Sequence, residues 1–144
     1  MIRFETSVEI ARAHEDVFDY VADAGRLAEW NLAVTTVEPL PGAPGHHVMR
    51  RELPTGVAIN EITIAARRPD EMTLRTITGP TPFVYRYTFT PASTGTRVTL
   101  RAEMELGGVA RLAGPLAAHG LRRGVDANLS SLRDILESSK ASSD

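Results

Sequence analysis

The stretch that decides the fold is Phe83-Val84-Tyr85-Arg86-Tyr87-Thr88-Phe89, in which every second residue is aromatic. Successive side chains of a β-strand point to opposite faces of a sheet, so these rings are expected on one face. The whole chain has four Phe, three Tyr and one Trp, so half of its aromatic residues lie in this strand. The pattern predicts a strand whose aromatic face is either ordinary core or one wall of a ligand cavity.

Alternating patterns of the same kind occur on both sides of this stretch. Short segments rich in Pro and Gly separate them, and connections this short join antiparallel neighbours, because parallel strands need long crossovers. Strands are predicted at residues 2–11, from Val34 onward, and at 46–53, 57–66, 71–78, 82–90 and 96–106. The sequence therefore predicts an antiparallel sheet of about seven strands.

Helical patterns occur near both ends of the chain. A short helix is predicted to open at His14, and a second short helical piece to end near Trp30. After Gly107-Gly108 the period changes to about 3.6 residues and stays so to roughly Glu137. Within this long helix Gly114-Pro115 is expected to cause a kink, because proline removes a backbone hydrogen bond.

A curved antiparallel sheet gripping one long C-terminal helix is the economical way to bury these faces, which makes the fold class α+β. Only two short helices and one long one are available to cover the sheet, so part of its concave face is expected to stay open as a cavity. Residues 1–138 are predicted to form a single ligand-binding domain, and residues 139–144 a flexible polar tail.

Composition excludes several classes of function. The net charge is −2 and basic residues are interleaved with acidic ones, so no one-signed patch predicts nucleic-acid binding. The chain has no cysteine and no apolar run long enough to span a membrane, which fits a cytoplasmic protein. No signal-peptide pattern is present at the N-terminus. The sequence leaves a homodimer open.

The sequence predicts no metal site and no cofactor. Of the four histidines, His46 and His47 are adjacent, and adjacent residues of a strand point to opposite faces. No two histidines have the i, i+4 spacing of zinc hydrolases, and no Gly-x-Ser-x-Gly motif offers a nucleophile. General acid–base chemistry is the route to catalysis that remains.

Three segments carry a resemblance to a known family. They are Val17-Phe18-Asp19-Tyr20-Val21-Ala22-Asp23 followed by Trp30, then Gly95-Thr96-Arg97-Val98-Thr99-Leu100, and Leu129-Ser130-Ser131-Leu132-Arg133-Asp134-Ile135-Leu136-Glu137. With them the chain resembles, from about residue 2 to 137, the SRPBCC superfamily with its START-like helix-grip fold, typified by the major birch pollen allergen. Within it the chain is most similar to the polyketide cyclase/dehydrase family.

The resemblance implies a deep, mostly apolar cavity between the sheet and the long helix. It implies a protein that binds a small hydrophobic ligand, aromatic or polyketide-like, with cyclisation or dehydration by acid–base chemistry as an open question. The alternatives are a non-catalytic carrier of lipids or small molecules and an interaction protein of the chaperone-activator kind. No residue is assigned as catalytic.

Residues expected to line the cavity come from the opening helices, the central strands, the aromatic strand and the long helix. They are Trp30, Met49, Asn60, Phe83, Tyr85, Tyr87, Phe89, His119 and Arg123. Three alternatives stay open. Either Asn60 or Glu61 faces the cavity, depending on a bulge near this pair, and Glu61 would be the better base. Trp30 is either a packing anchor or a stacking platform. His119 and Arg123 either bind a carboxylate or phenolate at the pocket end or simply face solvent.

Overall fold

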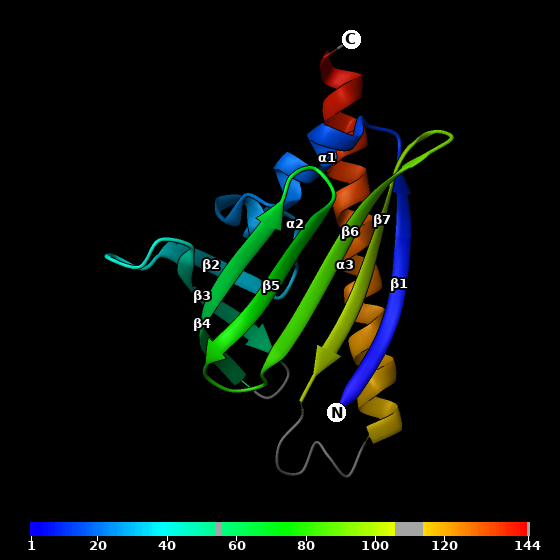
Figure 1. The fold of residues 1–144 in the computed structure, drawn as a ribbon. Helices are drawn as coiled ribbons and strands as arrows, with labels where there is room; N and C mark the ends of the chain where they lie inside the picture. Colours follow the sequence, from blue (N-terminus) through cyan, green and yellow to red (C-terminus); the bar gives the residue numbers. More distant parts are fainter. Residues whose placement is uncertain (54–55, 106–113, 144) are drawn as a thin grey trace.

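The sheet has seven antiparallel strands, as the sequence predicted, and their order is β1-β7-β6-β5-β4-β3-β2 (Figure 1). The computed structural model describes residues 1–53, 56–105 and 114–143, without the side chains of Gly114 and residues 140–143. The strands are β1 (Ile2–Ile10), β2 (Val34–Pro39), β3 (His46–Leu53), β4 (Gly56–Arg67), β5 (Glu71–Thr78), β6 (Phe83–Ala92) and β7 (Gly95–Met104).

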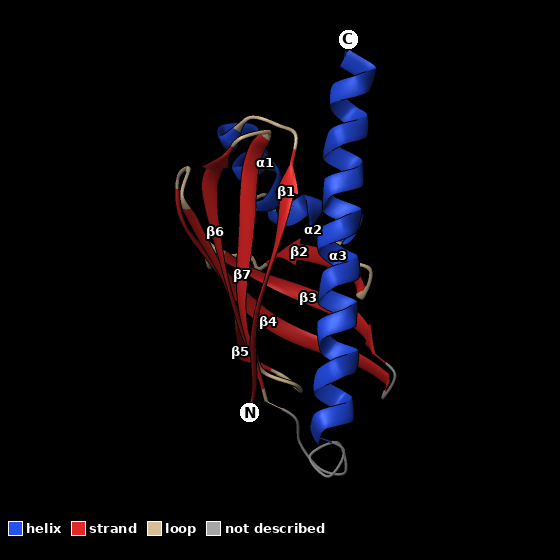
Figure 2. Cartoon of the chain, turned by 90° about the vertical axis from the view of Figure 1, so that its right-hand side faces the viewer, coloured by secondary structure: helices blue, strands red, loops and turns tan. Residues whose placement is uncertain are grey.

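In the described part of the chain, four helical segments complete the fold. Between β1 and β2 lie α1 (His14–Val21), the short 3-10 helix η1 (Ala24–Arg26) and α2 (Leu27–Trp30), and the chain ends in α3 (Gly114–Ser143). Figure 2 shows α3 lying across the concave side of the curved sheet, with α1 and α2 at one end. α3 packs on β1 and α2. This is the helix-grip arrangement that the sequence predicted. Within the described ranges, no helix has the length and apolar character needed to cross a bilayer.

The described part of α3 runs from Gly114 to Ser143. The kink predicted at Gly114-Pro115 depends on the residues just before Gly114, which lie outside the described residues, so it stays a prediction. The segment 107–113, for which helix was predicted, lies outside the described residues. At the other end the helix continues to Ser143, through most of the segment 139–144 predicted to be a flexible tail.

Inward-facing residues of the sheet meet one face of α3 to form a single core. On β6 the buried residues are every second one, as the alternation predicted. On α3 the period is that of a helix, and the buried residues are Val125, Leu129, Leu132 and Leu136. Burying one such large apolar side chain contributes about 2 kcal/mol, so the fold depends mainly on this shared core.

On β4 the structure decides between Asn60 and Glu61. Asn60 is fully buried and lies on the same face as Ile62, whereas Glu61 is half-buried on the other face with its Oε1 3.1 Å from His46 Nδ1. The irregularity predicted near this pair exists in the pairing with β5, between Glu61 and Ile62. The extra residue of the irregularity is on β5, between Thr76 and Thr78, so the alternation of β4 itself continues unbroken.

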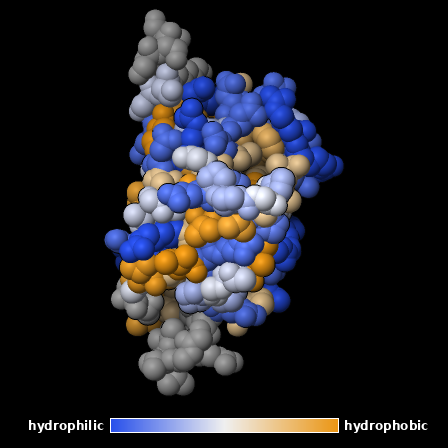
Figure 3. Space-filling model, turned by 90° about the vertical axis from the view of Figure 1, so that its left-hand side faces the viewer, coloured by the Kyte–Doolittle hydropathy of each residue, from blue (hydrophilic) through white to orange (hydrophobic). Residues whose placement is uncertain are grey.

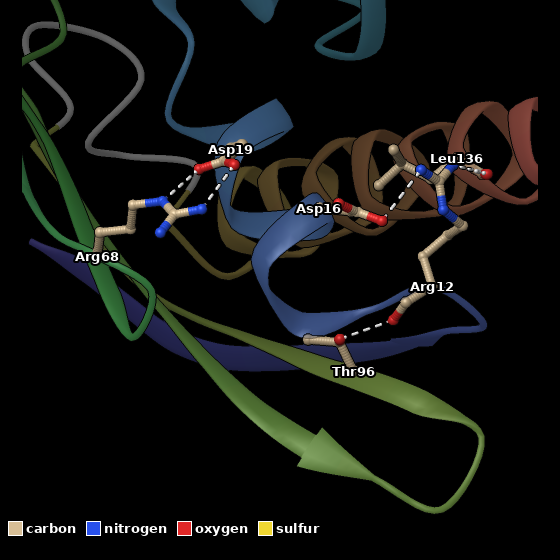
Figure 4. A network of polar contacts seen from close by, with 6 residues as sticks. All are labelled: Arg12, Asp16, Asp19, Arg68, Thr96 and Leu136. Carbon is tan, nitrogen blue, oxygen red and sulfur yellow. Dashed lines mark hydrogen bonds and ion pairs between the residues drawn. The ribbon is translucent and has the colours of Figure 1, made fainter.

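A polar network fastens the end of the fold where α1 lies (Figure 4). Arg12, just after β1, donates from Nη1 to the carbonyl oxygen of Leu136 on α3 at 2.8 Å. The backbone oxygen of Arg12 accepts from Thr96 Oγ1 at 2.9 Å. Arg68 holds Asp19 of α1 through both carboxylate oxygens, at 2.9 and 3.1 Å. These contacts join α1, α3, β7 and the β4–β5 turn, and they stabilise the packing of these elements at this end of the molecule.

Several apolar side chains remain exposed on the sheet. The largest exposed fractions among those of β4 and β5 belong to Val57, Ile59 and Ile77, at 52%, 53% and 47%. Figure 3 shows apolar side chains gathered among polar ones on the face seen from the β2–β3–β4 side. The homodimer that the sequence left open stays a prediction.

Candidate ligand-binding site

The aromatic stripe of β6 consists of Phe83, Tyr85, Tyr87 and Phe89. Its two halves have different neighbours. Phe89 packs edge-on against Phe18 of α1, with ring centroids 5.3 Å apart. Tyr87 packs edge-on against Trp30 of α2, with centroids 6.0 Å apart. Phe89 and Tyr87 therefore pack α1 and α2 against the sheet, since such edge-to-face pairs stabilise packing.

The other half of the stripe has different neighbours. The rings of Phe83 and Tyr85 lie tilted against each other with centroids 4.4 Å apart. The guanidinium of Arg51, from β3, lies 4.9 Å from the centroid of the Phe83 ring. An arginine over a ring face is attracted by the ring quadrupole, more strongly when both are removed from water. Here both are buried, with exposed fractions of 4% each.

One nitrogen of Arg51 is tightly anchored. Nη2 donates to Asn60 Oδ1 at 2.8 Å, and the carbonyl oxygens of Pro80 and Thr81 and the Thr81 hydroxyl lie 3.2 to 3.4 Å from it. The Asn60 amide donates in turn to the carbonyl oxygens of Thr78 and Pro80, at 3.0 and 2.9 Å. The guanidinium position is thus fixed by β4 and by the loop between β5 and β6.

The remaining donors of Arg51 have no acceptor in the described chain. A guanidinium has five N–H donors, and two of them are on Nη2. Nε is buried without a hydrogen-bond partner. Nη1 donates to no described residue. Arg51 forms no ion pair in residues 1–53, 56–105 and 114–143, and the sequence of 54–55 and 106–113 contains no Asp or Glu.

The loop that holds Arg51 has an unusual backbone. Gly79 has φ +101° and Thr81 has φ +50°, in a region that L side chains rarely adopt. A Cβ at Gly79 would overlap the carbonyl oxygen of Ile59 and lie 2.7 Å from Asn60 Nδ2. Such strain persists where the surroundings enforce it, and it is frequent at ligand sites. The close approach of Gly79 to β4 is what brings the Pro80 and Thr81 carbonyls to Arg51.

Tyr85 and Tyr87 are kept neutral by burial. Burial raises the pKa of Tyr85 to about 12, with the charge of Arg51 opposing the shift. Burial also raises the pKa of Tyr87, and the neighbouring Tyr85 adds to the effect. Neither phenol hydroxyl forms a hydrogen bond to another residue of the described chain. Both are therefore neutral hydrogen-bond donors on the inner face of the sheet at any physiological pH.

The structure brings most of the predicted site residues together and separates two of them. Met49 is buried on the inner face of β3, directly opposite Asn60 in the β3–β4 pairing. Trp30 contacts Tyr87, and its Nε1 is buried without a partner among the described residues. His119 and Arg123 are both exposed on α3. No described contact connects them with Arg51, so their part in ligand binding stays a prediction.

Sequence reasoning missed Arg51 and Thr81. Arg51 shares the phase of Met49 on β3, so the alternation that placed Met49 inside places Arg51 inside too. The charge pattern was considered only as a whole, which does not separate the buried Arg51 from the exposed Arg50 beside it. No sequence signal identifies Thr81, because its role depends on the loop geometry.

A hollow of about 570 Å³ lies between the α1–α2 region and the C-terminal part of α3, away from Arg51 and Phe83. Its lining is rich in charged side chains, including Asp16, Asp19, Asp23 and Glu29. These acids form ion pairs with Arg12, Arg26 and Arg68, and no group of them in the described residues is arranged to hold a metal ion. This hollow does not suit a hydrophobic ligand.

The chain was compared with known families and proteins. A family model described as "Polyketide cyclase / dehydrase and lipid transport" matches residues 1–137. A comparison with curated protein sequences finds no match.

Solved structures share the fold over nearly the whole chain. The di-domain ARO/CYC StfQ from the steffimycin biosynthetic pathway superposes with a TM-score of 0.75 at 20% identity, over 97% of this chain and 52% of its own. A START superfamily protein from Mycobacterium smegmatis gives 0.68 at 15% identity, over 94% and 99%. A conserved protein from Geobacillus kaustophilus gives 0.83 at 15% identity, over 96% and 97%. The chain spans about half the length of the di-domain protein, and these identities show the fold alone.

Proposed function

The chain belongs to the polyketide cyclase/dehydrase and lipid transport family, and from this membership we propose that it binds a small hydrophobic molecule, aromatic or polyketide-like, between the sheet and α3. That it has a ligand-binding helix-grip fold is given by the family. The chemical class of the ligand is the proposed part.

The observation that carries the proposal is an interior aromatic surface with polar groups that have no hydrogen-bond partner among the described residues. Phe83 and Tyr85 form an apolar wall, and the Tyr85 hydroxyl has no acceptor in the described chain. Arg51 Nε and Trp30 Nε1 are also buried without a partner among the described residues. Buried polar groups are normally hydrogen-bonded, and each unpaired one costs about 1–3 kcal/mol. An aromatic ligand with oxygen substituents beside Phe83 would accept hydrogen bonds from Tyr85 and Arg51.

Ligand binding is tested directly on the intact protein. In a thermal-shift panel of flat aromatic and lipid molecules, we expect the aromatic compounds to raise the unfolding temperature and the simple fatty acids to raise it less. A ligand at about 100 times its Kd stabilises the folded state by about 2.7 kcal/mol, which such an assay detects. Native mass spectrometry gives the stoichiometry. A protein that no aromatic compound stabilises would contradict the proposal.

Acid–base turnover of the ligand is a second candidate function. Tyr85 favours it, because a phenol that stays neutral beside a guanidinium is well suited to donate a hydrogen bond to a carbonyl oxygen. A carbonyl polarised in this way loses a proton from its neighbouring carbon more readily. The family description includes cyclases and dehydrases. A non-catalytic carrier would need the same wall of Phe83 and Tyr85 but would release its ligand unchanged.

Conservative substitution of the tyrosines separates catalysis from binding. On a substrate that the wild type turns over, Tyr85→Phe is expected to lower kcat about 10- to 100-fold with a smaller change in KM, because the hydroxyl acts on the reacting carbonyl. Tyr87→Phe is the matched control, since Tyr87 packs against Trp30. Equal kcat values for the wild type and Tyr85→Phe would remove this phenol from the mechanism.

A further inference from the structure

Among the described residues, the buried Arg51 has no acidic partner. Arg51 is 4% exposed, and the described residues offer it carbonyl, amide and hydroxyl oxygens but no carboxylate. A buried charge is costly unless it is paired, and arginine cannot escape the cost by losing its proton. An apolar side chain at this position would pack without that cost. The charge at this position therefore costs stability, which points to a role other than packing.

The contacts of the Arg51 guanidinium show which of its donors remain for a ligand. Nη2 is fixed by Asn60 and the β5–β6 loop, so the guanidinium does not need a ligand to hold it in place. Its Nε and Nη1 donors are the ones without an acceptor in the described chain. A planar guanidinium with unpaired N–H groups matches a carboxylate or another anionic oxygen better than it matches a neutral group.

The position of the cation fits the aromatic wall. Arg51 lies over Phe83, and Phe83 contacts Tyr85, so the three side chains form one continuous surface. The Tyr85 hydroxyl is a second, neutral donor on the same surface. A flat ring beside this wall with an acidic oxygen substituent would satisfy both donors.

We infer that the ligand is a flat hydrophobic molecule with an anionic oxygen, a carboxylate or an ionised phenol or enol, and that Arg51 binds this oxygen. The inference rests on the proposed function and adds the charge of the ligand to it. It places anion recognition on β3, whereas the sequence suggested Arg123 of α3, which is exposed.

Pairs of probes with the same ring system, one anionic and one neutral, test the inference. Naphthoate and naphthamide are compared by calorimetry for a carboxylate, and nitronaphtholate and its methyl ether for an ionised phenol. We expect at least one anion to bind about 10-fold or more tightly than its neutral counterpart, since a hydrogen bond between charged groups is roughly twice as strong as a neutral one. The pair in which the anion binds more tightly shows whether the charge of the ligand is that of a carboxylate or of an ionised phenol.

Arg51→Met is expected to lower the affinity for the preferred anion about 10- to 100-fold and to change that for its neutral counterpart less than about threefold. The matched control is Arg50→Met, because Arg50 is the neighbouring residue with its side chain exposed on the other face. A loss of similar size in both variants, or equal binding of acids and neutral counterparts to the wild type, would overturn the inference and leave the proposed function standing. Failure of all four probes to bind would overturn both.

A second pair of variants keeps the test valid if Arg51→Met does not fold. Thr81 Oγ1 lies 3.2 Å from Arg51 Nη2, and Thr81 has φ +50°, which Asp and Asn tolerate better than Thr. Thr81→Asp supplies an internal carboxylate to Arg51, and Thr81→Asn is its neutral isostere. We expect Thr81→Asp to bind the preferred anion about 10-fold or more weakly than Thr81→Asn does. Equal affinities in the two variants would contradict a role of the Arg51 charge.

Discussion

Gly79→Ala is expected to destabilise the protein by about 3 kcal/mol and to disturb the site at the same time. At φ +101° an L side chain is strained, and the added Cβ would overlap the carbonyl oxygen of Ile59. Strain of this kind costs about 1–3 kcal/mol, and overpacking against backbone costs a similar amount. The Cβ would also lie 2.7 Å from Asn60 Nδ2, so the amide that holds Arg51 must move. Urea denaturation measures the loss.

Gly42→Ala is the control for Gly79→Ala. Gly42 also has a positive φ, +78°, but a Cβ there would meet nothing within 4 Å. Its substitution should therefore cost only the backbone strain, about 1 kcal/mol, and leave ligand affinity unchanged. If both variants lost the same stability, the close approach of Gly79 to β4 would not be the cause.

Alkaline pH is expected to destabilise the protein through its buried tyrosines. The pKa of Tyr85 is about 12 in the folded protein and about 10 in the unfolded chain, so between these values only the unfolded chain has lost the proton. The stabilising effect is fully present below pH 10 and is lost as the pH rises toward 12. The loss is about 1.4 kcal/mol per pH unit, or about 3 kcal/mol in total. Tyr87 acts in the same direction.

The measurement is the free energy of unfolding in urea across this alkaline range. The double variant Tyr85→Phe/Tyr87→Phe keeps Tyr20 and removes both buried phenols from β6. We expect its stability to fall much less steeply with pH than that of the wild type. Parallel curves for the two proteins would show that the phenols are accessible to solvent and not held neutral by burial.

The aromatic strand β6 shows how far the sequence predicted the site. The alternation on β6 predicted that Phe83, Tyr85, Tyr87 and Phe89 share a face, and all four are buried. It did not predict that Phe89 and Tyr87 would contact α1 and α2 while Phe83 would contact Arg51. Periodicity gives the face of a side chain, but contacts between distant segments depend on how the elements pack.

The sequence by itself determined the seven strands, their antiparallel pairing and the long C-terminal helix, because periodicity and turn residues act over short stretches of chain. It also determined that the four aromatic residues of β6 share one face. Only the tertiary structure decided that Asn60 faces inward, that His119 and Arg123 are exposed, and that Arg51 is a buried cation. The reason is that burial and pairing of a polar side chain depend on groups far away in the sequence. For Arg51 those groups are Asn60 and the backbone oxygens of Pro80 and Thr81.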